Sequence, residues 1–354
     1  MIPYLAIAAT PAIIALFFSN ITNSQSIAVR RKYEKRYLLL CGLIIFLFLA
    51  LRNKSIGSSD TYNYYNMMQR AIFADEWKQY YNPDGVEIGF QFFVFILSRF
   101  FKSPQMIIVI SAIIYVIGIL YTIYNNSDDL ALSVTMYITL GLMQFQMQGM
   151  RQSIAMSICL FAYEFAKRRK IIYFSLLVLL AMQFHQTAIV FITVYFIFWL
   201  KYKWNYLCAF VIASGLFFYF SNYIIGFANE LFDKNYYTSV DSGGFIATAI
   251  YFLIIVFAFV FNMKLHTNRF HMAILYITMM GCICFMMRYI GTLAAERISF
   301  YFVFGQLILL PNTIVCLKPK ERQVIKIAVY VLMFLLFAYR LRGSDFLPYT
   351  FYWQ

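Results

Sequence analysis

The amino-acid sequence predicts an all-α polytopic membrane protein, folded as one integral membrane domain over residues 1–354. Hydrophobic residues make up 62% of the chain and charged residues 12%, and the mean hydropathy is +0.70. Soluble domains are about 45–50% apolar and about 25% charged. The apolar residues also recur in runs that approach the roughly 20 residues a helix needs to cross a bilayer. A water-soluble globule, a disordered chain and a secreted disulfide scaffold are therefore excluded.

The apolar runs predict about twelve transmembrane helices. Charged residues and clusters of Asn, Pro and Gly separate one run from the next. Several runs are only about 15 residues long, so they need flanking polar groups, a locally thinner bilayer or burial against neighbours. The predicted spans lie near residues 3–20, 37–51, 104–122, 131–148, 152–166, 171–184, 186–200, 204–221, 244–262, 271–289, 297–316 and 324–340.

One further apolar segment, residues 88–101, is shorter than most of the predicted spans. Whether it crosses the membrane determines on which side each later loop lies. If the segment re-enters, most Lys and Arg residues, including the KRRK run at 167–170, lie on the cytoplasmic side. A full crossing reverses that balance, against the positive-inside rule. We therefore expect a re-entrant or interfacial helix over 88–101, both termini outside, and a largest outer loop over residues 52–87.

Arginine outnumbers lysine among the basic residues predicted at the outer face. The guanidinium group is a planar donor that binds phosphate oxygens bidentately and stays charged when partly buried. A phosphate-bearing anionic ligand at this face would explain the bias. The alternative is that these side chains snorkel or pair with nearby carboxylates. The arginines are Arg52, Arg70, Arg99, Arg151, Arg288, Arg297, Arg340 and Arg342.

Arg151 lies between two apolar runs joined by a very short turn. A charge at the centre of a spanning helix costs about 2.5–3.5 kcal/mol, and less near its end, so such residues usually line a cavity. Glutamines surround Arg151 at a spacing of two, which fits no single helical face and predicts an unwound or kinked helix end. A polar turn at the interface is the alternative. These glutamines are Gln144, Gln146, Gln148 and Gln152.

His185 also lies between two short apolar runs and is flanked by glutamines. It is either a structural hydrogen-bonding residue or a group that exchanges protons near neutral pH. The outer loop 52–87 mixes carboxylates with aromatic rings such as Tyr64, which suit stacking on sugars and equally suit anchoring at the interface. Glu87 begins the 88–101 segment, where helix capping competes with a catalytic role.

The charge of +14 does not predict nucleic-acid binding, because the basic residues are scattered between apolar runs and form no single face. The sequence contains no Gly-rich phosphate loop, no HExxH, no GxSxG and no cluster with metal-ligand spacing. We therefore expect neither a metal nor a cofactor.

The order of several short motifs resembles the EpsG/Wzy family of bacterial exopolysaccharide and O-antigen polymerases, over roughly residues 30–350. The chain departs from the family pattern at Glu87-Ile88-Gly89-Phe90, where a proline commonly follows the glutamate, and at Gln186, where a small or basic residue is usual. The matching motifs are Arg52 with Gly57, Asp60 and Tyr64; Glu87-x-Gly89-Phe90; Arg151-Gln152-x-x-Ala155; Ala181 with His185; Arg297-x-x-x-Tyr301 with Pro311; and Pro348-Tyr349.

The resemblance implies a fold similar to the membrane glycosyltransferases that use polyprenyl donors (GT-C-like) and a place in the bacterial cytoplasmic (inner) membrane, with the active site facing outward. Such a polymerase moves a growing glycan from one undecaprenyl pyrophosphate carrier to another lipid-linked repeat unit. A chain-length regulator and a flippase are expected partners.

The outer-face residues supply a hypothesis for this chemistry. Arginines would bind the donor pyrophosphate and stabilise charge on the leaving group, while a carboxylate or an imidazole would deprotonate or orient the acceptor hydroxyl. The pyrophosphate candidates are Arg151 and Arg297, with Arg52 or Arg288. The base candidates are Asp60, Glu87 and His185, and the glycan-binding candidates are Gln148, Gln152, Tyr64 and Tyr349.

Four other functions compete with polymerisation. A lipid-linked oligosaccharide flippase would be a longer chain with two related halves. A membrane O-acyltransferase would need polar residues that reach its donor from the cytoplasm, whereas here they cluster outside. An O-antigen ligase usually has a large late outer loop, and the late loop here, 222–243, is short. A small-molecule transporter would carry ionisable residues near mid-span.

Overall fold

The computed structural model describes residues 1–22, 27–57, 59–83, 85–200, 204–220, 223, 243–262, 268–286 and 297–354. Every regular element in these ranges is a helix, and the β pairing among them is a single antiparallel bridge between Arg52 and Phe351. The predicted all-α class is confirmed.

The described residues form these helices in chain order. The first half of the chain contains α1 (Ile2–Thr22), α2 (Ile27–Ala50), α3 (Ser59–Phe73), α4 (Trp77–Tyr80), α5 (Ile88–Phe100), α6 (Met106–Asn126), α7 (Leu130–Thr139), α8 (Leu142–Gln148) and α9 (Met150–Lys167). The second half contains α10 (Ile171–Met182), the 3₁₀ helix η1 (Gln186–Phe191), α11 (Ile192–Ile197), α12 (Trp204–Tyr219), α14 (Gly243–Phe261), α15 (Arg269–Met286), α17 (Phe304–Val315) and α18 (Pro319–Leu341).

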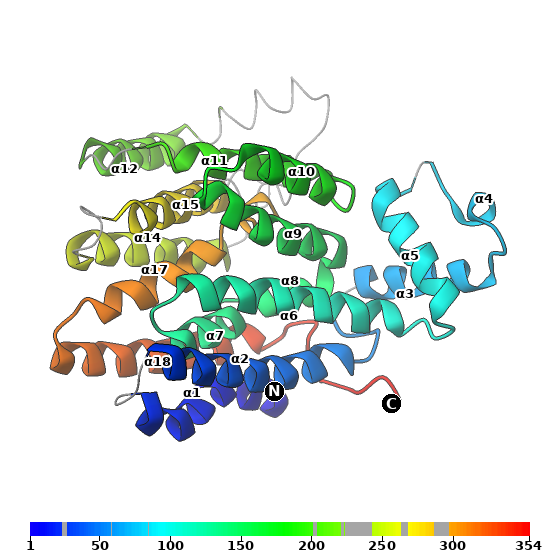
Figure 1. The fold of residues 1–354 in the computed structure, drawn as a ribbon, viewed down its shortest axis with the longest axis horizontal. Helices are drawn as coiled ribbons and strands as arrows, with labels where there is room; N and C mark the ends of the chain where they lie inside the picture. Colours follow the sequence, from blue (N-terminus) through cyan, green and yellow to red (C-terminus); the bar gives the residue numbers. More distant parts are fainter. Residues whose placement is uncertain are drawn as a thin grey trace.

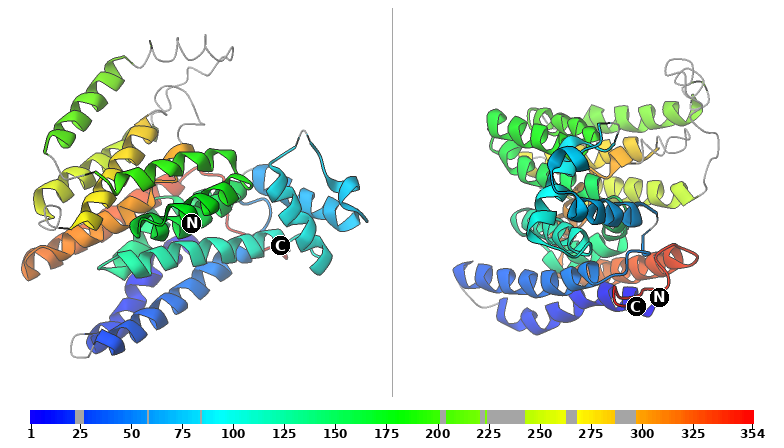
Figure 2. Two further views of the ribbon diagram at one scale, coloured as in Figure 1. Left: turned by 45° about the horizontal axis from the view of Figure 1, so that its top comes forward. Right: turned by 90° about the vertical axis from the view of Figure 1, so that its right-hand side faces the viewer.

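Most of these helices lie side by side and form a bundle, whereas α3, α4 and α5 project beyond one end of it (Figures 1 and 2). Within the bundle, α9 packs against α10 and α6, α6 packs against α2, and α7 packs against α1, α17 and α18. In the projecting part, α3 packs against α5. The segment predicted as the largest outer loop thus contains α3 and α4.

Three helices in the described residues, α6, α15 and α18, are long and apolar enough to cross a membrane, and the bent pair α7–α8 is a fourth candidate. Several other apolar helices are shorter, such as the 12-residue α10. The count of twelve spans therefore stays a prediction. Large apolar side chains on α18 are mostly exposed, including Val324 (68%), Val331 (53%) and Leu335 (64%), as expected for a helix that faces lipid.

Three boundaries differ from the predicted spans. The basic residues 30–36 lie inside α2, which begins at Ile27, and not in a loop before it. The span predicted over 131–148 bends by 48° between α7 and α8, because Gly141 adopts a left-handed conformation (φ +93°) that only glycine accepts readily. The span predicted over 186–200 begins as the 3₁₀ helix η1.

The 88–101 segment forms α5, a helix of 13 residues. At 1.5 Å per residue it spans about 20 Å, short of the roughly 30 Å hydrocarbon core. Its packing against α3, outside the main bundle, fits a segment that does not cross. The re-entrant or interfacial assignment remains a prediction.

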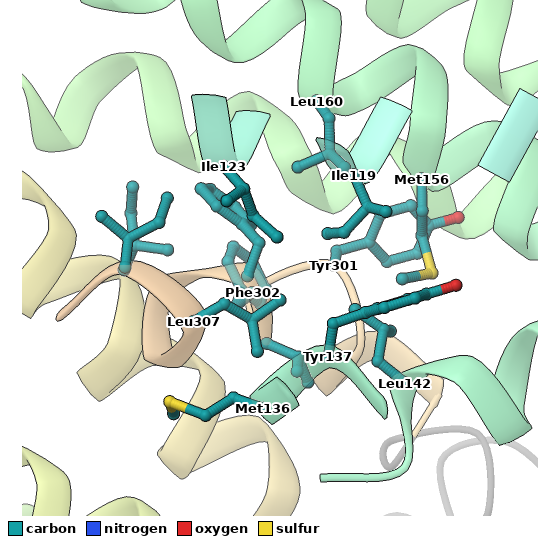
Figure 3. Close-up of a cluster of buried hydrophobic side chains, with 14 of the residues drawn as sticks. Ile119, Ile123, Met136, Tyr137, Leu142, Met156, Leu160, Tyr301, Phe302 and Leu307 are labelled. Atoms are coloured by element: carbon teal, nitrogen blue, oxygen red, sulfur yellow. The ribbon is translucent and has the colours of Figure 1, made fainter. Parts of the chain in front are cut away.

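A buried apolar cluster joins the middle of the bundle (Figure 3). Ile119 of α6, Tyr137 of α7, Leu142 of α8 and Met156 of α9 meet Tyr301, which precedes α17. Because Tyr137 and Leu142 lie on either side of the bend at Gly141, this core fixes the angle between α7 and α8.

A polar cluster links three helices at the far end of α9. Asn126 of α6 donates a hydrogen bond to Glu164 of α9 (2.8 Å) and accepts one from Lys167 (2.7 Å). Glu164 also forms an ion pair with Lys167 (3.2 Å). Asn312 of α17 donates to the Asn126 carbonyl (2.9 Å). These contacts satisfy the buried Glu164 carboxylate and tie α6, α9 and α17 together.

We expect Glu164→Ala to lower the free energy of unfolding by about 3 kcal/mol, because it removes one partner of a largely buried ion pair. The matched change Glu34→Ala breaks the more exposed pair with Arg30 (2.9 Å) and should cost less than about 1 kcal/mol. Unfolding of the purified protein in detergent measures both changes. Equal destabilisation by the two variants would contradict this assignment.

Candidate active site

A polar cavity of about 300 Å³ lies at the α3–α5 end of the bundle, where α3, the α8–α9 junction and the residues before α17 meet. Most residues predicted from the sequence as ligands or bases border it, although they come from distant parts of the chain. These residues are Asp60, Tyr64, Gln148, Arg151, Gln152, His185 and Arg297.

Two glycines, Gly141 and Gly149, lie at the two ends of α8, in the part of the cavity wall next to Arg151. Gly141 ends the turn after α7, and Gly149 separates α8 from α9. Two helix ends therefore meet beside the cavity, and Gln148 and Arg151 lie next to the second break. The kinked helix end predicted from the glutamine spacing is confirmed.

Glu87, at the start of α5, joins two other segments through its carboxylate. Its Oε2 forms an ion pair with Arg151 at the start of α9. Its Oε1 lies 3.1 Å from Nδ1 of His185 and accepts a hydrogen bond from the backbone N–H of Gln186 (3.1 Å). The two predicted base candidates, Glu87 and His185, are thus in direct contact.

The environment of Glu87 keeps it ionised. Burial alone would raise its pKa, but hydrogen bonds from His185 and from backbone N–H groups, together with the charge of Arg151, outweigh burial and lower the pKa to about 2. An ionised carboxylate only accepts hydrogen bonds, so Nδ1 of His185 carries the proton in this contact. In the neutral imidazole, Nε2 is then the acceptor, the form that a general base requires.

Arg151 is held on two sides. In addition to its ion pair with Glu87, its Nε donates to the Tyr64 hydroxyl (3.4 Å). Tyr64 in turn packs edge-to-face on Phe90, with ring centroids 5.4 Å apart. These contacts occupy Nε and Nη1 of Arg151, and Nη2, which has no partner among the described residues, remains for a ligand.

Arg297 is held differently. Its backbone carbonyl accepts a hydrogen bond from Gln152 of α9, so the main chain is anchored. Its guanidinium lies 3.8 Å from the Asp60 carboxylate, and the two side chains are 53% and 39% exposed. Such an exposed pair is worth about 1 kcal/mol or less, and an anionic ligand can replace Asp60 at little cost.

Two predicted ligands do not border the cavity. Arg52 is buried and donates to the carbonyl oxygens of Leu49 (2.6 Å) and Met147 (3.0 Å), which lie near the ends of α2 and α8. It thereby satisfies carbonyls that have no helical partner, at the negative ends of two helix dipoles. Tyr349 donates to the carbonyl of Phe48 (2.7 Å) and stacks on its ring. Arg288 lies outside the described residues.

Three cavity residues were not among the predicted ligands or bases. Arg340, near the end of α18, was predicted only as one of the outer-face arginines, Gln144 of α8 only as one of the glutamines around Arg151, and the ring of Phe300 not at all. Phe300 stacks on Phe145 with centroids 3.8 Å apart and forms an apolar wall. Arg340 reaches the cavity because α18 packs against α7. No local sequence pattern indicates that contact.

The Glu87 contacts predict a distinct pH dependence of stability. Its folded-state pKa of about 2 lies below the ordinary value of 4.5, so the carboxylate stabilises the fold above about pH 4.5, and this contribution is lost as the pH falls toward 2. The stability difference between the wild type and Glu87→Gln should therefore shrink as the pH falls from about 4.5 toward 2. Thermal unfolding in detergent at each pH measures it.

Glu76→Gln is the control for this experiment, since Glu76 is exposed and makes no side-chain cap to α4. It should show no comparable change with pH. If Glu87→Gln behaved like Glu76→Gln, the ion pair with Arg151 would contribute nothing to the fold.

In a comparison with known proteins, a family model described as the EpsG family matches residues 35–351, a range that includes every residue lining the cavity. This confirms the family predicted from the motif order. No curated protein and no solved structure matches the chain.

Proposed function

Because the chain belongs to the EpsG family, we propose that the cavity is the active site of a polymerase that joins undecaprenyl-pyrophosphate-linked repeat units on the outer leaflet of the bacterial cytoplasmic membrane. Family membership implies a general role in polysaccharide polymerisation, and the apolar helices agree with an integral membrane protein. The observation that carries the finer proposal is that Glu87 holds Arg151 and His185 at one cavity, which Arg297 also lines.

Arg297 and Arg151 would bind the donor pyrophosphate. Arg297 exchanges its loose contact with Asp60 for phosphate oxygens, and Arg151 adds the donors of Nη2. Negative charge grows on the pyrophosphate as its bond to the sugar breaks. Positioned guanidinium groups stabilise that charge most strongly in the transition state.

His185 would be the general base. The acceptor hydroxyl oxygen attacks the anomeric carbon of the donor sugar, and the bond from that carbon to the pyrophosphate oxygen breaks. The hydroxyl proton passes to Nε2 of His185, and undecaprenyl pyrophosphate leaves. Glu87 does not take the proton, because its pKa of about 2 makes it a weak base; it orients the imidazole and stabilises the imidazolium that forms.

The remaining lining suits a carbohydrate. The stacked rings of Phe145 and Phe300 offer an apolar surface for a sugar face, and the Gln148 amide offers both a donor and an acceptor for hydroxyl groups. Arg52 and Tyr349 are not part of this proposal, since their polar groups serve the packing of α2 and α8.

Deletion of the gene tests the function. We expect the surface glycan, run as a ladder on a gel, to collapse to a single repeat unit on its final carrier, because export and transfer continue without polymerisation. Lipid-linked units trapped inside the cell would indicate a flippase. Lipid-linked polymer left unattached would indicate a ligase, and an unchanged ladder lacking acyl groups would indicate an acyltransferase.

Complementation with point variants tests the residue roles. Arg297→Ala should lower the rate of polymer formation on the order of 10²–10³-fold, by analogy with the loss of one transition-state donor, and His185→Gln on the order of 10²–10⁴-fold. Membranes supplied with lipid-linked repeat units give the initial rates.

The matched control is Arg70→Ala, which removes an exposed arginine at the end of α3 that does not border the cavity. It should leave the rate unchanged. Normal-length polymer from folded Arg297→Ala and His185→Gln proteins would reject the assigned roles.

A further inference from the structure

We propose that Arg340 is a specificity-determining residue that lets the site select a diphosphate-linked carrier over a monophosphate-linked one, and that Gly141 positions it. This inference rests on the proposed function for the identity of the substrate. It concerns the part of the cavity that residues of α8 and α18 line.

The first observation is the charge of the lining. Three guanidinium groups border the cavity, from Arg151, Arg297 and Arg340, against the one lining carboxylate of Asp60. Glu87 supplies a second carboxylate beside Arg151. A diphosphate offers more anionic oxygens than a monophosphate, so a third guanidinium, from a different helix, suits a ligand with a second phosphoryl group.

The second observation is the fit between Arg340 and Gly141. A Cβ atom on residue 141 would lie 3.0 Å from Cζ of Arg340 and closer still to its Nη2. The guanidinium therefore occupies the space that any other side chain at 141 would fill. Because it is the end of a flexible side chain, a Cβ there would push it aside at a small steric cost, in addition to the backbone strain of a side chain at φ +93°. The absence of a side chain at Gly141 thus leaves the guanidinium its place.

The third observation points to a ligand at the same bend. Gln144, three residues after Gly141, is 7% exposed and borders the cavity. Its Oε1 is buried and has no hydrogen-bond donor among the described residues. A buried acceptor without a donor is costly, and a sugar hydroxyl next to the phosphate would supply the missing donor. The bend thus presents an anion-binding group and a hydroxyl-binding group together.

Binding of short soluble analogues tests the proposal without any polymerase assay. The purified full-length protein in detergent is titrated with farnesyl diphosphate and with farnesyl monophosphate. We expect the wild type to prefer the diphosphate. Arg340→Gln should weaken diphosphate binding about tenfold to a hundredfold, the value of a hydrogen bond to a charged group, and leave monophosphate binding nearly unchanged.

Two matched controls separate this role from a structural one. Arg342→Gln removes an exposed arginine two residues away that does not border the cavity. Gly343→Ala places a side chain at another left-handed glycine (φ +71°), where the added Cβ meets nothing within 4 Å. Both controls should bind the two analogues as the wild type does.

Gly141→Ala provides the decisive comparison. It should reduce the diphosphate preference as Arg340→Gln does, and the double variant should be no worse than Arg340→Gln alone, because both changes remove the same contact. A wild type without preference, an Arg340→Gln protein with wild-type preference, or additive effects in the double variant would overturn the proposal. An Arg340-dependent preference combined with an unchanged glycan ladder in the deletion strain would instead overturn the proposed function alone.

Discussion

The Glu87 carboxylate is the contact on which the cavity depends. It joins the start of α5, the start of α9 and the turn before η1, three segments that are far apart in the chain. Without it, the charge of Arg151 would lie at the start of α9 with the Tyr64 hydroxyl as its only side-chain partner among the described residues. The same contact determines which nitrogen of His185 carries the proton. A single acidic side chain thus sets the position of a cation, the tautomer of an imidazole and the attachment of the α3–α5 projection to the bundle.

The position of Arg151 at a polar cavity could be predicted from the sequence, because the physical reasons for it involve only neighbouring residues. An arginine beside a short turn in an apolar chain must reach a polar space, and glutamines at a spacing of two cannot share a helical face. Both statements depend only on neighbouring residues. The helix break at Gly149 and the cavity beside Arg151 confirm them. His185 and Glu87 were each predicted as site residues, but their direct contact depends on tertiary packing and was not foreseen.

The parts that sequence reasoning missed depend on contacts between distant segments. Arg52 carries a guanidinium that could bind phosphate, yet this group donates a hydrogen bond to the carbonyl of Met147. That carbonyl lacks a partner within its helix because Gly149 interrupts the hydrogen bonding between α8 and α9. Arg340 enters the cavity through the packing of α18 on α7. The number of spans could not be predicted from hydropathy alone, because short apolar helices such as α10 gain part of their stability from neighbours.

Helix α9 has a polar anchor at each of its two ends. Arg151 is tied to Glu87 at the first turn, and Glu164 and Lys167 are tied to Asn126 at the last. A helix fastened in this way cannot slide along its own axis when the surrounding bilayer becomes thinner or thicker. Helix α18 is fastened near its start, where Lys326 forms an ion pair with Asp129 and Arg322 donates to the carbonyl of Val315. We therefore expect a change in lipid thickness to leave α9, and the cavity beside its first turn, in register with α5 and α6.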